Sequence, residues 1–550
     1  MRSAPIVLCA AFIVASGCSS SRQVVAAIGT GVDAPQPAAG PAETATMAAL
    51  ARIADLNPRL QAVIATDPTA IDQARAIDGG RVVGSLAGQP VLIKDNIETR
   101  GPLPTTAGSL ALLQNVTGRD APLVARLRGA GAIIIGKANL SEWANIRSSN
   151  SISGWSAVGG QARNPHALDR NACGSSTGSA VAVAAGMVRL AIGTETDGSI
   201  TCPAAVAGIV GFKPTVGLVS RTHVIPISVS QDTAGPMAAS VREAALLLTA
   251  IAGSDPADAA TADADKRRVD YAAALDAGAL MGKRIGVMRF ASGFGTDQPF
   301  NAALALLRAQ GATLVDIKQL DRKDLGAKEF EVLLTEFKAG LNDYLRTSPA
   351  PIPVRSLAEV IAYNRANAAR EMPLFGQDIF EQAEKTKGLA EAAYKQARSR
   401  SLELAGKKGI DRLLREHELD ALVGPTMAAA WKIDAVHGDQ IAGSGAGTLA
   451  AVAGYPHLTV PMGQVKGLPV GLSFLGPKWS DPLILSLGYA YEQARGPLPA
   501  PTLLRSIEEV PDIARALEPQ RQPFGPESSS AGTRDGAGNL PTTTTLYSPR

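Results

Sequence analysis

Two serines and a lysine carry the strongest chemical signal in this 550-residue chain. Ser175 and Ser199 stand in separate turns rich in glycine and hydroxyl side chains, and Lys94 follows the apolar run 90–93. A serine hydroxyl is a weak nucleophile until a base removes its proton, and a lysine acts as a base only when it is neutral. Burial can lower a lysine pKa from about 10.4 to about 7–8, at a cost of roughly 4 kcal/mol. The three residues therefore predict a serine hydrolase whose base is a lysine.

Ser199 is the candidate nucleophile because a predicted buried strand leads into its turn. The apolar run 187–192 precedes the turn at 193–199. Small residues in such a turn let successive N–H groups point into one concavity, which suits a developing oxyanion. We expect this oxyanion hole to use the backbone N–H groups of Thr196, Asp197, Gly198 and Ser199.

Ser175 lies just before a predicted buried helix. The segment 180–185 is apolar on every face, and the hydroxyl-rich string 173–179 before it suits helix capping. This order places Ser175 at the positive end of the helix.

These strings resemble the amidase signature family, in which a second serine and a lysine activate a serine nucleophile. The resemblance covers about residues 48–495, and it rests on Lys94-Asp95-Asn96, Thr106-Ala107-Gly108-Ser109, the strings at 131–139, the two serine turns and Gly211-Phe212-Lys213-Pro214-Thr215-Val216-Gly217. It implies that Ser199 is the nucleophile, that Ser175 bridges to the base beside a cis peptide bond, and that Lys94 is the general base. It also implies an α/β fold, a single large domain with a mixed β-sheet core covered by helices on both sides. No metal or organic cofactor is implied.

Within that family, the chain is most similar to the bacterial peptide amidases. The strings that carry this similarity are 139–145, 153–157, 195–199 and 228–237. It implies hydrolysis of the C-terminal amides of peptides or amino acids, with release of ammonia. A general aliphatic or aryl amidase of the same family is the alternative. A lipid-anchored binding protein without turnover is a further alternative, which ammonia release from any amide would exclude.

Two departures from the family pattern lie beside the nucleophile. Asp197 stands where family members often have a first glycine, so its carboxylate has to point away from the developing negative charge. Thr201 stands where amidases that act on acidic substrates can carry an arginine. The second departure favours neutral substrates.

Two rival motifs are present. The string 174–178 matches the nucleophile elbow of α/β-hydrolases, which would make Ser176 the nucleophile with His437 or His457. An elbow needs a strand immediately before it, whereas residues 164–173 are polar and contain proline. Residues 131–137 resemble a phosphate loop, but their isoleucines indicate a strand. We expect neither motif to function.

The N-terminus resembles that of an exported lipoprotein. Residues 1–18 have signal-peptide proportions and end at Cys18 after two small residues, as in a lipoprotein box. We expect Cys18 to be lipidated and the protein to reach the bacterial cell envelope or periplasm, with plain secretion as the alternative. The predicted organisation is a signal peptide at 1–18, a flexible linker at 19–45, an amidase domain at 46–515 and a disordered tail at 516–550.

Charge and cysteine content add little to the assignment. The net charge of +3 comes from 53 basic and 50 acidic residues without a basic run, so nucleic acid is not an expected partner. The expected partner is a small-molecule or short-peptide amide, with membrane contact only through Cys18. Cys173 and Cys202 could form a disulfide in an exported protein, but two cysteines make no framework, and we expect buried thiols.

The elements that must position these residues follow from hydrophobic patterning. A helix is predicted over 47–56, and strands and helices alternate from residue 90 to about 253, as in an α/β core. Residues 300–420 are predicted to be a helical layer covering this core. Further strands are expected at 283–288, 421–426 and 458–462.

Overall fold

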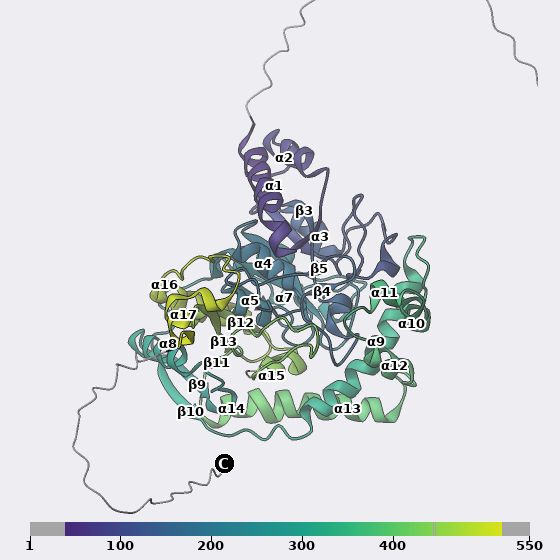
Figure 1. The fold of residues 1–550 in the computed structure, drawn as a ribbon. Coiled ribbons are helices and arrows are strands. Elements are labelled where there is room, and N and C mark those ends of the chain that lie inside the picture. Colours follow the sequence, from purple (N-terminus) through teal and green to yellow (C-terminus); the bar gives the residue numbers. More distant parts are fainter. Residues whose placement is uncertain (1–38, 444, 446, 520–550) are drawn as a thin grey trace, which may run out of the picture. The chain divides into compact units, whose positions relative to one another are not determined.

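The computed structural model describes residues 39–443, 445 and 447–519 (Figure 1). The predicted signal peptide, Cys18 and the predicted tail from residue 520 lie outside the described residues. Helix α1 (Pro41–Leu60) begins within the segment predicted as linker, because the Asp78 carboxylate accepts hydrogen bonds from the first N–H groups of this helix. Helix α17 (Pro511–Leu517) extends slightly into the segment predicted as tail.

A mixed sheet of eleven strands forms the centre of the domain. Its order is β1-β3-β2-β6-β8-β7-β12-β13-β11-β9-β10. The pairs β2–β3, β2–β6, β9–β10 and β9–β11 are parallel, and the other pairs are antiparallel. The strands are β1 (Val63–Thr66), β2 (Pro90–Lys94), β3 (Ile133–Ala138), β6 (Leu190–Glu195), β7 (Val210–Lys213), β8 (Thr233–Ala238), β9 (Arg284–Met288), β10 (Thr313–Ile317), β11 (Ala421–Pro425), β12 (His457–Val465) and β13 (Leu468–Leu475). A separate hairpin pairs β4 (Trp155–Ser156) with β5 (Gly160–Gln161).

Helices cover both faces of the sheet, as the family resemblance implies. In β2, Val91 and Ile93 pack into one hydrophobic cluster and Leu92 into another, because successive strand residues point to opposite faces. The first cluster includes α3 (Pro122–Gly129), α6 (Val241–Ile251), α8 (Asp297–Ala309) and α16 (Asp481–Arg495). The second includes α1, α2 (Ala70–Asp78), α4 (Thr177–Ala184) and α5 (Thr201–Ala207). Lys94 follows Leu92 by two residues, so it points to the face of α4 and α5.

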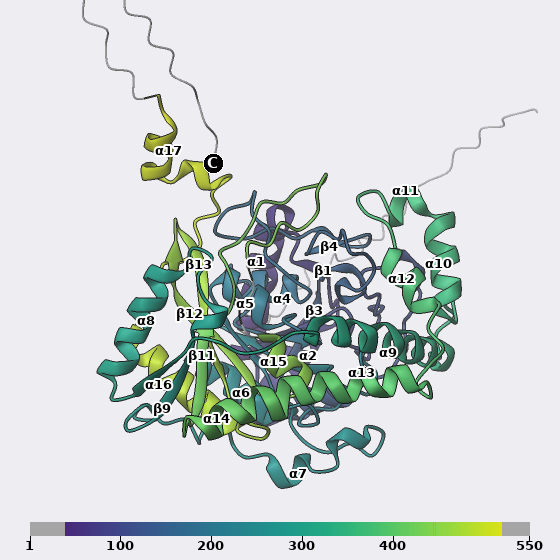
Figure 2. The ribbon, with the colours of Figure 1, turned by 90° about the horizontal axis from the view of Figure 1, so that it is seen from below.

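Residues 300–420 form the predicted helical layer, with one exception. The helices are α9 (Leu325–Thr347), α10 (Leu357–Ala366), α11 (Ala368–Glu371), α12 (Asp378–Glu384), α13 (Ala392–Leu402) and α14 (Asp411–Glu416), with a π-helical segment at Glu403–Ile410. Helices α9 and α13 run side by side (Figure 2). The exception is β10, an edge strand whose half-exposed side chains left no apolar run in the sequence.

The remaining α-helices of the described residues are the short α7 (Ala264–Arg267) and α15 (Gly447–Ala453). Among the described helices, none combines the length and the apolar character needed to cross a membrane.

Candidate active site

Lys94 is fixed at the carboxyl end of β2, with no exposed surface. Its Nζ donates to Ser175 Oγ at 2.7 Å, to Thr194 Oγ1 at 2.8 Å and to the Thr194 carbonyl at 3.3 Å. Thr194 belongs to β6, the strand next to β2 in the sheet, so two parallel neighbours hold the amine in place. The structure thus brings together Lys94 and Ser175, which lie far apart in the sequence.

Burial gives Lys94 the proton affinity of a base. It lowers the pKa of the Lys94 ammonium to about 7, although the negative charges of Asp232 and Glu195 act in the opposite direction. A substantial fraction of the amine is therefore neutral near pH 7 and can accept a proton.

A second buried lysine shows what a structural lysine looks like in this fold. Lys137 Nζ lies 3.3 Å from Asp95 Oδ1 and donates to the Ile97 carbonyl at 2.6 Å. Its charge is therefore paired, whereas no carboxylate lies within ion-pair distance of Lys94 among the described residues. The Lys94-Asp95-Asn96 string thus contains one candidate base and one carboxylate that neutralises a neighbouring lysine.

Ser175 lies just before α4, whose N-cap residue is Ser176. The Gly174–Ser175 peptide bond is cis, which confirms the expectation drawn from the family resemblance. The Ser175 hydroxyl has no exposed surface and faces the Lys94 amine. Its position fits a group that passes a proton to the lysine.

Ser176 is a structural residue, and the nucleophile elbow weighed for it is absent. Its hydroxyl donates to the Thr194 carbonyl at 3.0 Å and accepts from the Thr194 N–H at 3.2 Å, which ties α4 to β6. His457 Nε2 lies 2.6 Å from Ser473 Oγ, and exposed His437 pairs with Asp434. Neither histidine contacts Ser176.

The Ser199 turn lies between β6 and α5. Gly198 has a φ of +77°, a backbone conformation that side chains with a Cβ rarely adopt. No described residue accepts a hydrogen bond from the N–H of Asp197, Gly198 or Ser199. These three donors are free to bind an oxyanion, and the oxyanion hole of Thr196, Asp197, Gly198 and Ser199 stays a prediction.

Glu195 supports this turn, a role that the sequence analysis did not predict. Its Oε2 accepts hydrogen bonds from the N–H groups of Ile200 at 2.8 Å and Thr201 at 2.9 Å. The carboxylate therefore satisfies the first free donors of α5 and fixes the residues that follow the nucleophile. The available signals were an acidic residue directly after an apolar run and its place in the string 195–199.

The two serine turns are tied together. The Ser176 N–H donates to the Ser199 carbonyl at 3.0 Å, and a disulfide joins Cys173 to Cys202 with a Cα–Cα distance of 6.0 Å. The expectation of buried thiols was wrong, because contact between the two turns brings their flanking cysteines within disulfide distance. No hydrogen bond joins the hydroxyls of Ser175 and Ser199 in the described part of the chain. Such catalytic contacts often tighten only when substrate binds.

Ser199 opens onto a cleft of about 370 Å³, here called the substrate cleft. The apolar part of its wall comes from Ile146, Ile227, Leu333, Met427 and Ile441. Asp197 is the one carboxylate among the described lining residues, and no lysine or arginine lines the cleft there. Asp197 Oδ2 accepts a hydrogen bond from Thr448 Oγ1 at 2.7 Å, so the carboxylate is turned toward α15.

The tryptophans in the peptide-amidase-like strings do not line the substrate cleft. Trp143 packs edge-on against Phe380 with ring centroids 5.9 Å apart, and Trp155 packs against Phe375 at 5.2 Å. Trp143 belongs to the same hydrophobic cluster as Ile146, which lines the cleft. Neighbouring Ala144, Asn145 and Ser153 are the residues of these two tryptophan-containing strings that reach the cleft.

Comparison with known proteins identifies the family. The Amidase family model matches residues 44–485. A relative from Arabidopsis thaliana, named as a probable amidase, is 41% identical over 460 residues, which are 81% of this chain and 85% of that protein. The structure of native peptide amidase from Stenotrophomonas maltophilia is 51% identical with a TM-score of 0.79, covering 84% of this chain and 95% of that one. An amidase family protein from Bacillus anthracis is 37% identical with a TM-score of 0.76, covering 84% and 89%. The chain is an amidase and belongs to the amidase signature family.

Proposed function

We propose that this amidase releases ammonia from the C-terminal amides of peptides or amino acids through an acyl-enzyme formed on Ser199. The observation that carries the chemistry is the 2.7 Å contact between Lys94 Nζ and Ser175 Oγ in a buried site beside the Ser199 turn. The 51% identity to a peptide amidase supports the substrate class.

In the proposed reaction, Ser199 Oγ attacks the amide carbon while its proton passes through Ser175 to neutral Lys94. The free N–H groups of the Ser199 turn stabilise the oxyanion. The proton then returns through Ser175 to the leaving nitrogen, and ammonia departs. Water attacks the acyl-enzyme by the same proton path, which releases the carboxylic acid and restores Ser199.

The proposed substrate preference follows from the charge of the substrate cleft. Asp197 lines it, and Thr201 stands where an arginine could bind a substrate carboxylate. An acidic substrate would bring an unpaired carboxylate into this site, which costs several kcal/mol. We therefore expect a neutral peptide amide to be hydrolysed at least tenfold more efficiently than malonamate. On the similarity to peptide amidase, we expect the same preference over a simple fatty amide, with internal peptide bonds largely spared.

Ammonia release from the three substrates measures this preference, and mass spectrometry should show the gain of about 1 Da that amide-to-acid conversion produces. Chymostatin is a competitive inhibitor of a peptide amidase that is 51% identical to this chain, so it should compete with the peptide amide here. A tenfold preference for malonamate or the fatty amide would contradict the peptide-amide assignment and favour a general amidase. Absence of ammonia from every amide would favour the non-catalytic binding protein.

We further propose that the protein is exported and anchored by a lipid at Cys18, on the sequence pattern alone. The Cys18→Ser variant should then move from the membrane fraction to the soluble or unprocessed fraction, because a lipidated cysteine supplies the only expected membrane anchor. Cell fractionation and N-terminal sequencing of the mature protein measure this. If the amount in the membrane fraction did not change and the mature N-terminus were not residue 18, lipidation at Cys18 would be contradicted.

A further inference from the structure

A second cavity of about 440 Å³, here called the rear cavity, meets the active site from the side of Lys94. Ala144, Thr196 and Ile227 line both the rear cavity and the substrate cleft, so the two spaces share a wall. Thr194 also lines the rear cavity, and its Oγ1 accepts the hydrogen bond from Lys94. The substrate cleft thus reaches the active site at Ser199. The rear cavity reaches it at Thr194, which accepts the hydrogen bond from Lys94.

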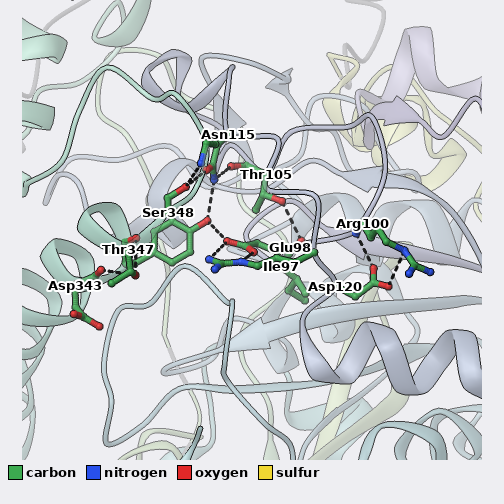
Figure 3. A network of polar contacts seen from close by, with 12 residues as sticks. Ile97, Glu98, Arg100, Thr105, Asn115, Asp120, Asp343, Thr347 and Ser348 are labelled. Atoms are coloured by element: carbon green, nitrogen blue, oxygen red, sulfur yellow. Dashed lines mark hydrogen bonds and ion pairs between the residues drawn. The ribbon is translucent and has the colours of Figure 1, made fainter.

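The rear cavity is open to solvent at the side away from the base. Its lining includes Val229, which is 56% exposed, and the exposed residues Asp343 and Thr347 of α9. Figure 3 shows Asp343 and Thr347 next to the polar network that contains Glu98 and Asn115. A continuous lining of described residues therefore runs from solvent to Thr194.

Two arginines that line the rear cavity are paired with carboxylates, and the carboxylate of Asp232 there is hydrogen-bonded. Arg119 Nε lies 2.6 Å from Glu98 Oε2, and Arg221 Nε lies 2.8 Å from Asp258 Oδ2. Asp232 accepts hydrogen bonds from Thr196 Oγ1 at 2.6 Å and from the N–H groups of Ile227 at 2.8 Å and Ser228 at 2.9 Å. Paired charges gain little from an ionic ligand, whereas polar walls of this kind suit small neutral molecules that form hydrogen bonds.

The chemistry of the proposed reaction requires two such molecules at the base. In acylation, the Ser199 O–H and the substrate amide form a Ser199 ester, and the broken C–N bond together with the serine proton yields one ammonia. In deacylation, one water cleaves that ester, which returns the proton to Ser199 and releases the acid. During the second step the acyl group is still bonded to Ser199 and occupies the substrate cleft.

We propose that the rear cavity is the route by which ammonia leaves and hydrolytic water enters while the acyl group fills the substrate cleft. This inference rests on the Ser199 mechanism proposed above. A water molecule takes up about 30 Å³ in the liquid, so the rear cavity has room for both molecules. Asn96, which lines the cavity, donates to Thr194 Oγ1 at 3.0 Å. The same Thr194 oxygen accepts from Lys94, so Asn96 connects the cavity wall to the base.

Filling the rear cavity tests the proposal. Gly340 on α9 lines it, and a Cβ added there would meet Pro226 Cγ at 3.1 Å, so Gly340→Phe places a ring in the cavity wall. Thr222→Phe fills it from another segment of the wall. The matched control is Gly326→Phe, the same substitution on the same helix at an exposed position with nothing within 4 Å of the added Cβ.

The measurement is kcat for an amide that the wild type hydrolyses, together with the steady-state fraction of acyl-enzyme found by acid quench and intact mass spectrometry. We expect both filling variants to lose at least about tenfold in kcat and to accumulate acyl-enzyme, with KM falling in parallel, because water reaches the ester slowly. The control should behave as wild type.

Two results would overturn the proposal: kcat within twofold of the control in both filling variants, or a loss of kcat without accumulation of acyl-enzyme. The test uses any amide that is turned over, so an error in the proposed substrate class does not affect it. An acyl group found on a residue other than Ser199 in the quenched filling variants would refute the Ser199 mechanism itself and the inference with it.

Discussion

Replacing Ser199 with alanine should abolish ammonia release and the formation of any acyl-enzyme. The side chain that forms the covalent bond is lost, and removal of a serine nucleophile lowers kcat by about 10⁴-fold or more in enzymes of this mechanistic type. The oxyanion donors of the turn belong to the backbone, so Ser199→Ala should still fold and bind substrate. Ammonia assays and intact mass spectrometry of quenched protein measure the effect.

Ser176→Ala is the matched control, because it removes one hydroxyl from the neighbouring serine turn. Ser176 holds α4 to β6 through Thr194, so the variant should lose stability of about 1 kcal/mol but keep at least about a tenth of the activity. The reverse pattern, with Ser176→Ala inactive and Ser199→Ala active, would make Ser176 the nucleophile.

The sheet and the candidate nucleophile could be predicted because local patterns encode them. The apolar run 90–93 became β2, and 421–426 contains β11, since strands buried on both faces are continuously apolar. The start of β6 was predicted less accurately. The apolar run 187–192 was expected to be a strand, but β6 begins only at Leu190. β10 was missed because an edge strand needs no apolar run.

The contacts within the site could not be predicted, because they join distant segments. Thr194 receives the Lys94 amine across neighbouring strands, and nothing near Lys94 in the sequence identifies this partner. The Cys173–Cys202 disulfide likewise depends on contact between the two serine turns. The family resemblance supplied the pairing of Ser175 with Lys94, whereas the local sequence supplied only the residue types.

Replacing Lys94 should be nearly as damaging as replacing Ser199, because no other described side chain is placed to take the Ser175 proton. Lys94→Ala should be nearly inactive while folded, and Lys94→Met, which keeps the length of the side chain, should be equally inactive. Ser175→Ala should be severely impaired too, since it removes the proton bridge but leaves the oxyanion donors in place. Thermal unfolding checks the fold of each variant, and full activity in Lys94→Ala would refute the lysine as the base.

The pH profile gives an independent test of the same residue. Lys94 must be neutral to accept a proton, and burial places its pKa at about 7, so kcat/KM should rise with pH through about 7 and fall about tenfold per pH unit below it. The negative charge of Asp232 favours the lysine cation and raises this pKa. Asp232→Asn should therefore move the midpoint of the profile to lower pH, which a loss of packing alone would not do. If the midpoint stayed in place or moved to higher pH in Asp232→Asn, the profile would belong to a group other than Lys94, and a lysine base would have to be abandoned for this enzyme.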